Sequence, residues 1–122
     1  MSDKNNGKQV EYSEYKGRPG IGLPLGESGR YFFRFGVTKA EAAIANVDVV
    51  GVFVENQGII PVHSGAGARA TIGEYKGHPV LELPCGDGGR YTFSFGLSKA
   101  NALLAYEQKV RQFVADVRRM EG

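Results

Sequence analysis

The residue types in this sequence that could support metal or nucleotide binding are histidine, cysteine and glycine. His63, His78 and Cys85 are metal-ligating types, but no Cys-x-x-Cys or His-x-x-x-His spacing occurs. A Gly-x-Gly-x-x-x-Gly segment at residues 20–26 only loosely resembles a dinucleotide-binding loop, because Pro24 interrupts it and it precedes a predicted strand. A strand-end histidine, a turn histidine and a small buried thiol explain the first three residues better.

Catalysis by side chains alone is not indicated either. A hydrolase or transferase needs a nucleophile with its base, or paired carboxylates in one cleft. The chain shows no spacing that suggests either arrangement. We therefore predict that the protein is not an enzyme and that it carries no cofactor and no metal.

The pattern that does suggest binding chemistry is an aromatic residue flanked by arginines in a predicted strand. Arg30, Phe32 and Arg34 occupy alternate positions, so their side chains share one face of the strand. Such a face could stack a nucleobase on the ring while the guanidinium groups contact phosphates. A structural interpretation is equally open, since Phe32 could instead pack under the other half of the protein or in an oligomer interface.

The sequence segments that must position these residues occur twice in the chain. The sequence Glu-Tyr-Lys-Gly at residues 14–17 recurs at 74–77, and Phe-x-Phe-Gly at 33–36 recurs at 93–96, with no gap between the two alignments. Solenoid proteins need at least three repeats, so two copies indicate a closed pair related by a pseudo-two-fold axis.

Each copy shows the pattern of three strands. Lys-Gly followed by a proline, at residues 16–19 and 76–79, predicts the turn of a hairpin. Residues 59–63 predict a fourth strand in the second copy, and Pro61 favours an edge position for it. The first copy has no obvious equivalent.

A change of period from two to about 3.6 predicts one amphipathic helix at the end of each copy. Thr38 and Ser98 stand where N-caps are expected, and Thr38-x-x-Glu41 matches a capping box. The first helix contains Gly51 and several valines, so packing must hold it.

These patterns predict an α+β fold: two tandem copies of an antiparallel β-sheet unit followed by one helix, paired by a pseudo-two-fold axis. We expect a disordered leader at 1–8, a first repeat at 9–57 and a second at 58–122, both forming one compact domain. Strand alternation predicts a core face that the helices cover, formed by Tyr31, Phe33, Phe35 and Val37 and by Tyr91, Phe93, Phe95 and Leu97. The opposite face is predicted to be basic and polar.

Composition sets only broad limits. The 122 residues carry 15 basic and 13 acidic side chains, a net charge of +2 that permits an anionic partner without demanding one. A single cysteine suits a reducing compartment, so a cytoplasmic protein is expected. No apolar run is long enough for a membrane span, so no membrane partner is expected.

Two segments carry a resemblance to a known family. They are residues 74–83, Glu-Tyr-Lys-Gly-His-Pro-Val-Leu-Glu-Leu, and residues 89–99, Gly-Arg-Tyr-Thr-Phe-Ser-Phe-Gly-Leu-Ser-Lys, both repeated in the first copy. Their order resembles the single-stranded DNA-binding fold of the transcriptional coactivator positive cofactor four, whose plan Whirly proteins and Pur-alpha repeats share. The resemblance implies a binding module for single-stranded nucleic acid, DNA in particular, with a role related to transcription. The predicted binding residues are Lys16, Arg18, Arg30, Phe32, Arg34, Tyr75, Lys76 and Arg90.

The alternative is a structural or protein-interaction domain of the same fold that does not bind nucleic acid. Under this hypothesis Phe32 is buried in a homo-oligomer interface, and the near-balanced charge of the chain favours it slightly. The resemblance and the Arg-x-Phe-x-Arg pattern favour nucleic-acid binding.

Overall fold

The computed structural model describes residues 9–26, 31–60, 70–86 and 89–121. The helices and strands, in chain order, are β1 (Glu11–Tyr15), β2 (Arg18–Leu25), β3 (Tyr31–Gly36), α1 (Val37–Ala45), α2 (Val47–Glu55), β4 (Thr71–Tyr75), β5 (His78–Cys85), β6 (Tyr91–Phe95), α3 (Leu97–Ala105) and α4 (Glu107–Glu121). The predicted leader at 1–8 lies outside the described residues. Ile59 and Ile60 are not in a strand, and the rest of the predicted fourth strand, 61–63, also lies outside the described residues.

Each copy forms a three-stranded antiparallel sheet, β1-β2-β3 (sheet 1) and β4-β5-β6 (sheet 2). The registers match, since Ile21 opposes Phe35 in sheet 1 and Leu81 opposes Phe95 in sheet 2. Both predicted hairpins are confirmed. In each turn the Lys-Gly pair has positive φ at both residues, 53° and 79° in the first and 51° and 81° in the second. This is the backbone of a type I′ turn, whose twist matches that of the strands. The α+β fold with repeated sheet units is therefore confirmed.

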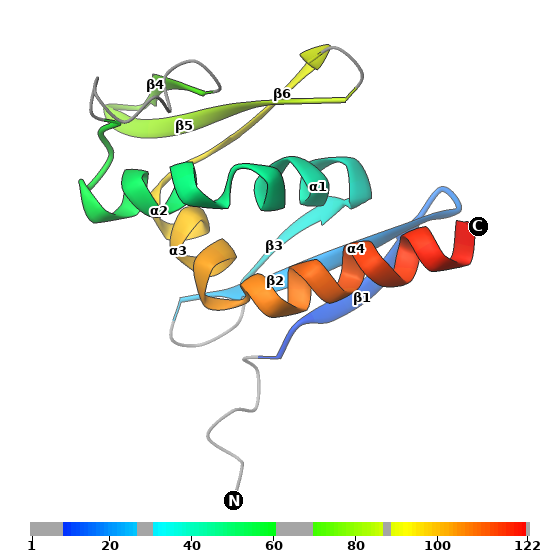
Figure 1. Ribbon diagram of the computed structural model, residues 1–122. Helices are drawn as coiled ribbons and strands as arrows, with labels where there is room; N and C mark the ends of the chain where they lie inside the picture. The colour runs from blue at the N-terminus through cyan, green and yellow to red at the C-terminus, as the bar shows by residue number, and fades with distance from the viewer. Residues whose placement is uncertain (1–8, 27–30, 61–69, 87–88, 122) are drawn as a thin grey trace, which may run out of the picture.

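The helices are exchanged between the two copies. Helix α1 follows sheet 1 in the chain, yet it packs chiefly on β5 of sheet 2, while α3 packs on β2 of sheet 1. Helix α4 in turn lies against α1 and β2. Helices α1, α2 and α3 consequently lie between the two sheets (Figure 1). Each copy thus buries the apolar face of the other. We call the sheet face that meets the helices its inner face, and the opposite one its outer face.

Aromatic residues from both copies meet at the centre of the core. The rings of Phe33 and Phe93 are 5.6 Å apart, and Phe35 and Phe95 pack around them at 4.9–6.0 Å. The contacts occur in pairs, because Lys39 Nζ lies over the ring of Phe93 and Lys99 Nζ over that of Phe33. Such paired contacts are those expected of a pseudo-two-fold arrangement.

Two of the predicted core residues are exposed. Tyr31 is 70% exposed and Tyr91 is 59% exposed, although both share the inner face with buried phenylalanines. They stand at the first residue of β3 and of β6, at the margin of each sheet. The predicted face is therefore right, but the core ends before these tyrosines.

Each predicted single helix is two helical segments. The first breaks at Asn46 and the second at Tyr106. Asn46 is buried, and its side-chain Nδ2 donates a hydrogen bond of 2.8 Å to the carbonyl oxygen of Ala42. This bond satisfies a polar side chain inside the core, where an unpaired amide would be costly.

The predicted N-caps are wrong. Helices α1 and α3 begin at Val37 and Leu97, and their N-caps are Gly36 and Gly96, which carry no side-chain capping bond. Thr38 and Ser98 therefore lie inside the first turn, because β3 runs directly into α1 and only Gly96 separates β6 from α3. Glu41, predicted to complete a capping box, instead forms an ion pair with Arg118 of α4.

Among the described residues, none of the helices has the length and apolar character required to cross a membrane.

Candidate functional site

The outer face of sheet 1 carries the predicted aromatic and basic residues. In β3 the buried rings of Phe33 and Phe35 point inward, so Phe32 and Arg34 between them point outward. Phe32 is half-buried and Arg34 is exposed. The helices that pack on sheet 1 do so through its inner face, where Phe113 of α4 stacks near Tyr12 of β1. The outer orientation of the predicted site residues in β3 therefore follows directly from the alternation of the strand.

Arg34 is held flat over this face by two contacts. Its guanidinium carbon lies 5.0 Å from the centre of the Phe32 ring, and its Nη1 donates to Glu11 Oε1 at 3.1 Å. Glu11 and Arg34 both register with Gly22 of the central strand, one from each side. A Cβ at Gly22 would lie 3.3 Å from Arg34 Cγ, so the missing side chain makes room for the arginine. Arg34 is thus oriented by a ring below it and a carboxylate beside it.

A groove of about 540 Å³ lies beside Arg34 on the same face. Its floor includes Gly20 and Gly36, and Ser13, Arg18 and Arg34 contribute to its walls. The volume is in the range of small-molecule and cofactor pockets. Glycines in the floor let a ligand approach the backbone closely. The groove therefore combines a flat floor with two exposed guanidinium groups.

Sheet 2 lacks this arrangement on its outer face. The positions that correspond to Gly20, Gly22, Phe32 and Arg34 are occupied by Val80, Glu82, Thr92 and Ser94. Thr71 donates a hydrogen bond of 2.7 Å to Glu82 Oε1, so a carboxylate stands where sheet 1 has a glycine. The buried inner-face residues Ile21, Leu23, Phe33 and Phe35 correspond to Leu81, Leu83, Phe93 and Phe95, so the core of each sheet keeps large apolar side chains. The two copies have thus diverged on their outer faces while preserving the core.

The structure does not bring all predicted site residues together. Tyr75 is 64% exposed and has Lys76 Nζ 5.3 Å from its ring centre, but Tyr75 ends β4 and Lys76 lies in the β4–β5 turn. The start of β5 lies at the end of the molecule opposite the β1–β2 turn (Figure 1). Lys16 is exposed in the β1–β2 turn, and Arg18 lines the groove. Arg30 lies outside the described residues.

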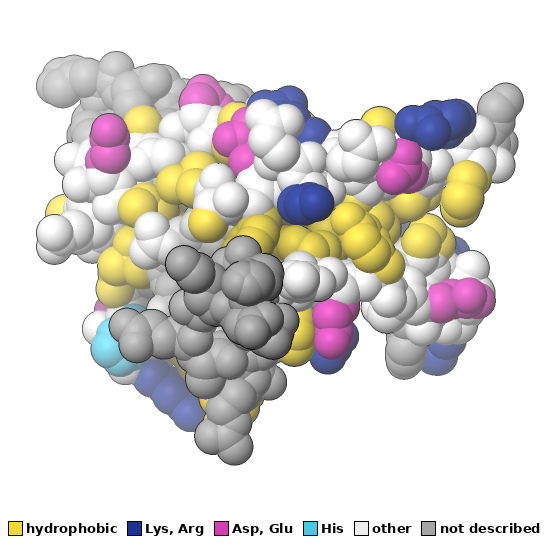
Figure 2. All heavy atoms as spheres, turned by 90° about the horizontal axis from the view of Figure 1, so that it is seen from below, with side chains coloured by type: hydrophobic (Ala, Val, Ile, Leu, Met, Phe, Trp, Pro, Cys, Tyr) yellow, Lys and Arg dark blue, Asp and Glu magenta, His cyan; other side chains and the backbone are white. Residues whose placement is uncertain are grey.

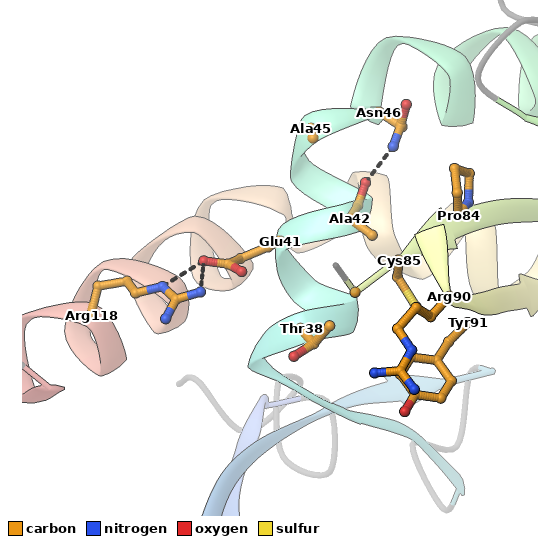
Figure 3. A pocket seen from close by; sticks show the side chains of 11 residues that line it. Thr38, Glu41, Ala42, Ala45, Asn46, Pro84, Cys85, Arg90, Tyr91 and Arg118 are labelled. Atoms are coloured by element: carbon orange, nitrogen blue, oxygen red, sulfur yellow. Dashed lines mark hydrogen bonds and ion pairs between the residues drawn. The ribbon is translucent and has the colours of Figure 1, made fainter. Parts of the chain in front are cut away.

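Arg90 also departs from expectation. The alternation of the sequence predicts that it shares the outer face of sheet 2, but it precedes the first residue of β6 and is not in the strand. Its guanidinium carbon lies 5.6 Å from the centre of the Tyr91 ring. Both side chains line a hollow that Thr38 of α1 also lines (Figure 3). The prediction failed because the strand, and with it the strict alternation, begins one residue later.

Sequence reasoning missed the glycines of the groove and the partner of Arg34. Gly20 and Gly22 lie in the middle of a strand, where glycine weakens the strand and often marks a close approach of another group. That signal was available in the sequence. The pairing of Glu11 with Arg34 was not, because it depends on the register of three strands.

Charge on the surface is local, with no extended field of one sign in the view from below. There, hydrophobic side chains form a band across the middle, and basic and acidic side chains are interspersed on both sides of it (Figure 2).

Within the described ranges, no three potential metal ligands of the histidine, cysteine or carboxylate type lie close enough together to hold an ion.

Comparison of the chain with models of protein families, with curated proteins and with solved structures found no match.

Proposed function

We propose that the outer face of sheet 1 binds single-stranded nucleic acid, with DNA as the expected ligand. The observation that carries this proposal is the position of Arg34. Its guanidinium group lies over the ring of Phe32, and it lines a groove whose floor includes Gly20 and Gly36. The second copy folds in the same register with Val80, Thr92 and Ser94 in place of Gly20, Phe32 and Arg34, so the fold does not require these three residues. A binding role gives a reason for their presence in one copy only.

The proposed mode of binding uses two kinds of contact. A nucleobase stacks over the exposed guanidinium of Arg34 or the open part of the Phe32 ring, which every base can do because each has a π-face. Arg18 and Arg34 contact neighbouring phosphates, and Gly20 lets the nucleic-acid strand approach the sheet closely. Since few cations take part, we expect weak, salt-dependent binding with little sequence preference.

We also propose that the fold is that of positive cofactor four and Whirly proteins, and that the protein has a role related to transcription. This proposal is supported by the repeated unit of antiparallel strands followed by helix, and by the tight association of the two copies. The protein acts in this proposal as a binding module and not as an enzyme. A reducing compartment such as the cytoplasm suits its buried free thiol, Cys85.

Fluorescence polarisation with labelled single-stranded oligonucleotides at low and moderate salt tests the proposal. We expect Phe32→Ala to weaken binding by about 1 to 3 kcal/mol, the usual value of a stacked base. Arg34→Ala should lower the slope of log affinity against log salt by about 0.7, as for one lost phosphate contact on a single strand. Thr92→Ala and Ser94→Ala, at the corresponding positions of sheet 2, are matched controls that should leave binding unchanged. Absence of binding at low salt would refute the proposal.

The two N-cap glycines allow a second test in which folding and binding respond differently. Gly36 and Gly96 have the same extended backbone, and a Cβ at either would contact only a proline carbonyl oxygen at 3.7 Å. Aspartate at either position should cap its helix and stabilise the fold by a few tenths of a kcal/mol. Gly36→Asp places a carboxylate in the groove and should weaken oligonucleotide binding, whereas Gly96→Asp should not. Equal binding by the two variants would argue against the groove.

A second candidate function, a protein-interaction domain that forms homo-oligomers, is favoured by exposed apolar surface. Tyr31, Tyr91 and Met120 are more than half exposed, and hydrophobic side chains gather across the middle of the molecule in the view from below (Figure 2). Sedimentation velocity separates the two candidates. If Phe32→Asp dissociates an oligomer formed by the wild type, the interaction domain is supported. An unchanged assembly with lost oligonucleotide binding supports the first proposal.

A further inference from the structure

The groove on sheet 1 continues beyond the margin of the sheet. A second hollow, of about 610 Å³, shares Arg18, Pro19, Phe35 and Gly36 with it. This hollow extends past the end of β3 to the first turn of α1, where Thr38 and Lys39 line it, and to Arg118 near the end of α4. The two hollows therefore share a rim, and Gly36, which has no side chain, is part of it.

A third hollow, of about 530 Å³, continues the same route. It shares Thr38 and Arg118 with the second one and reaches Arg90 and Tyr91 at the start of β6 (Figure 3). The start of α1, the end of α4 and the β1–β2 turn all lie on one side of the molecule, on the right in Figure 1, and the end of β5 lies on that side too. The three hollows therefore lead from the outer face of one sheet to the margin of the other.

Basic side chains follow this route. They are, in order from the groove, Arg34, Arg18, Lys39, Arg118 and Arg90. Three acidic residues lie along the route: Glu11, which pairs with Arg34, Glu14 beside the groove, and Glu41, which forms an ion pair with Arg118 (Figure 3). Such a succession of cations along connected hollows suits an extended polyanion.

The corresponding side of the other copy differs. A hollow of about 410 Å³ lies at the start of α3, lined by Tyr75, His78 and Lys99 among others. Helix α2 ends at Glu55, while α4 continues to Glu121, so the position equivalent to Arg118 is Gly58. The arginine that joins the second and third hollows thus exists only because α4 is longer than α2.

We propose that a single strand of nucleic acid bound on sheet 1 leaves the groove at Gly36, passes the first turn of α1 and ends against Arg90 at the margin of sheet 2. This inference rests on the proposed function and adds the path of the strand. Arg90 then contacts phosphates only when the ligand is long enough to reach it. Glu41 competes with those phosphates for Arg118.

Two lengths of oligonucleotide test this path. Labelled single strands of about 4 and about 16 nucleotides, the range of site sizes known for small single-strand binding folds, are titrated in fluorescence polarisation. Arg90→Ala should weaken binding of the long strand and lower its salt slope by about 0.7, with no effect on the short one. Glu41→Gln should strengthen binding of the long strand only. Arg111→Ala, on α4 but paired with Glu107, is the matched control and should change neither.

The outcomes separate this inference from the proposed function. If both strands bind and Arg90→Ala leaves the long one unchanged, or weakens both equally, the path is wrong while binding on sheet 1 stands. If neither strand binds at low salt, both proposals fail. Circular dichroism checks that Glu41→Gln remains folded, as expected for loss of an exposed ion pair. Arg90→Ala provides an independent result in case that variant does not.

Discussion

Replacing Phe33 with alanine is expected to lower the free energy of unfolding by about 3 to 5 kcal/mol. Phe33 is 5% exposed and contacts three other rings, two of which come from the second copy. Removing it leaves a cavity at the point where the copies meet, and the rigid strands around it can collapse only partly. Urea unfolding followed by circular dichroism measures the loss.

Phe32→Ala is the matched control for this prediction, since it removes the same side chain from the neighbouring residue on the outer face. Its effect on unfolding should be much smaller, because Phe32 is only half-buried, while its effect on oligonucleotide binding should be the larger of the two. If the two variants lose similar stability, the assignment of inner and outer faces in β3 is wrong.

Gly58→Ala is expected to destabilise the fold by at least about 2 kcal/mol. Gly58 has a φ of +108°, which an alanine adopts only with strain. A Cβ there would also lie 2.4 Å from Cγ of Pro79 in β5, and a proline ring cannot move aside. The amide of Gly58 donates to the carbonyl oxygen of Phe53 at 2.8 Å, which closes the end of α2. The substitution should therefore push α2 away from sheet 2, and thermal unfolding measures the loss.

A glycine inside α2 provides a control of opposite sign. Gly51 lies inside α2, and a Cβ built there meets nothing within 4 Å. Gly51→Ala should therefore stabilise the protein by about 0.5 to 1 kcal/mol, since glycine is a poor helix former. A Gly58→Ala variant as stable as Gly51→Ala would contradict the close packing of α2 against Pro79.

The parts of the fold that could be predicted from sequence depend on local signals. The turn of each hairpin was predicted from its glycine and proline, and Gly17 and Gly77 do take positive φ there. The type I′ geometry was not predicted, because it also needs positive φ at Lys16 and Lys76. Period-two alternation assigned Phe33 to the core and Phe32 to the opposite face. The helix caps were missed because Thr38 and Glu41 match a capping pattern that the direct passage from strand to helix at Gly36 prevents.

The candidate site could be predicted only in part. The sequence singled out Phe32 and Arg34, which do lie together on an open face. It misplaced Arg90, because alternation is strict only within a strand. The role of Gly22 depends on its position between Glu11 and Arg34, which neither β1 nor β3 reveals separately.

By itself the sequence determined that this protein is a duplicated α+β unit with two turns, two apolar strand faces and one face bearing an aromatic residue beside arginine. These features depend on residues close together in the chain, which the backbone constrains directly. Only the tertiary structure decided that α1 covers the sheet of the other copy, that Arg34 lies over Gly22, and that Thr38 and Arg118 join the hollows at the start of α1. Those features depend on contacts between segments far apart in sequence, and such contacts form only when the two copies bury their apolar faces together.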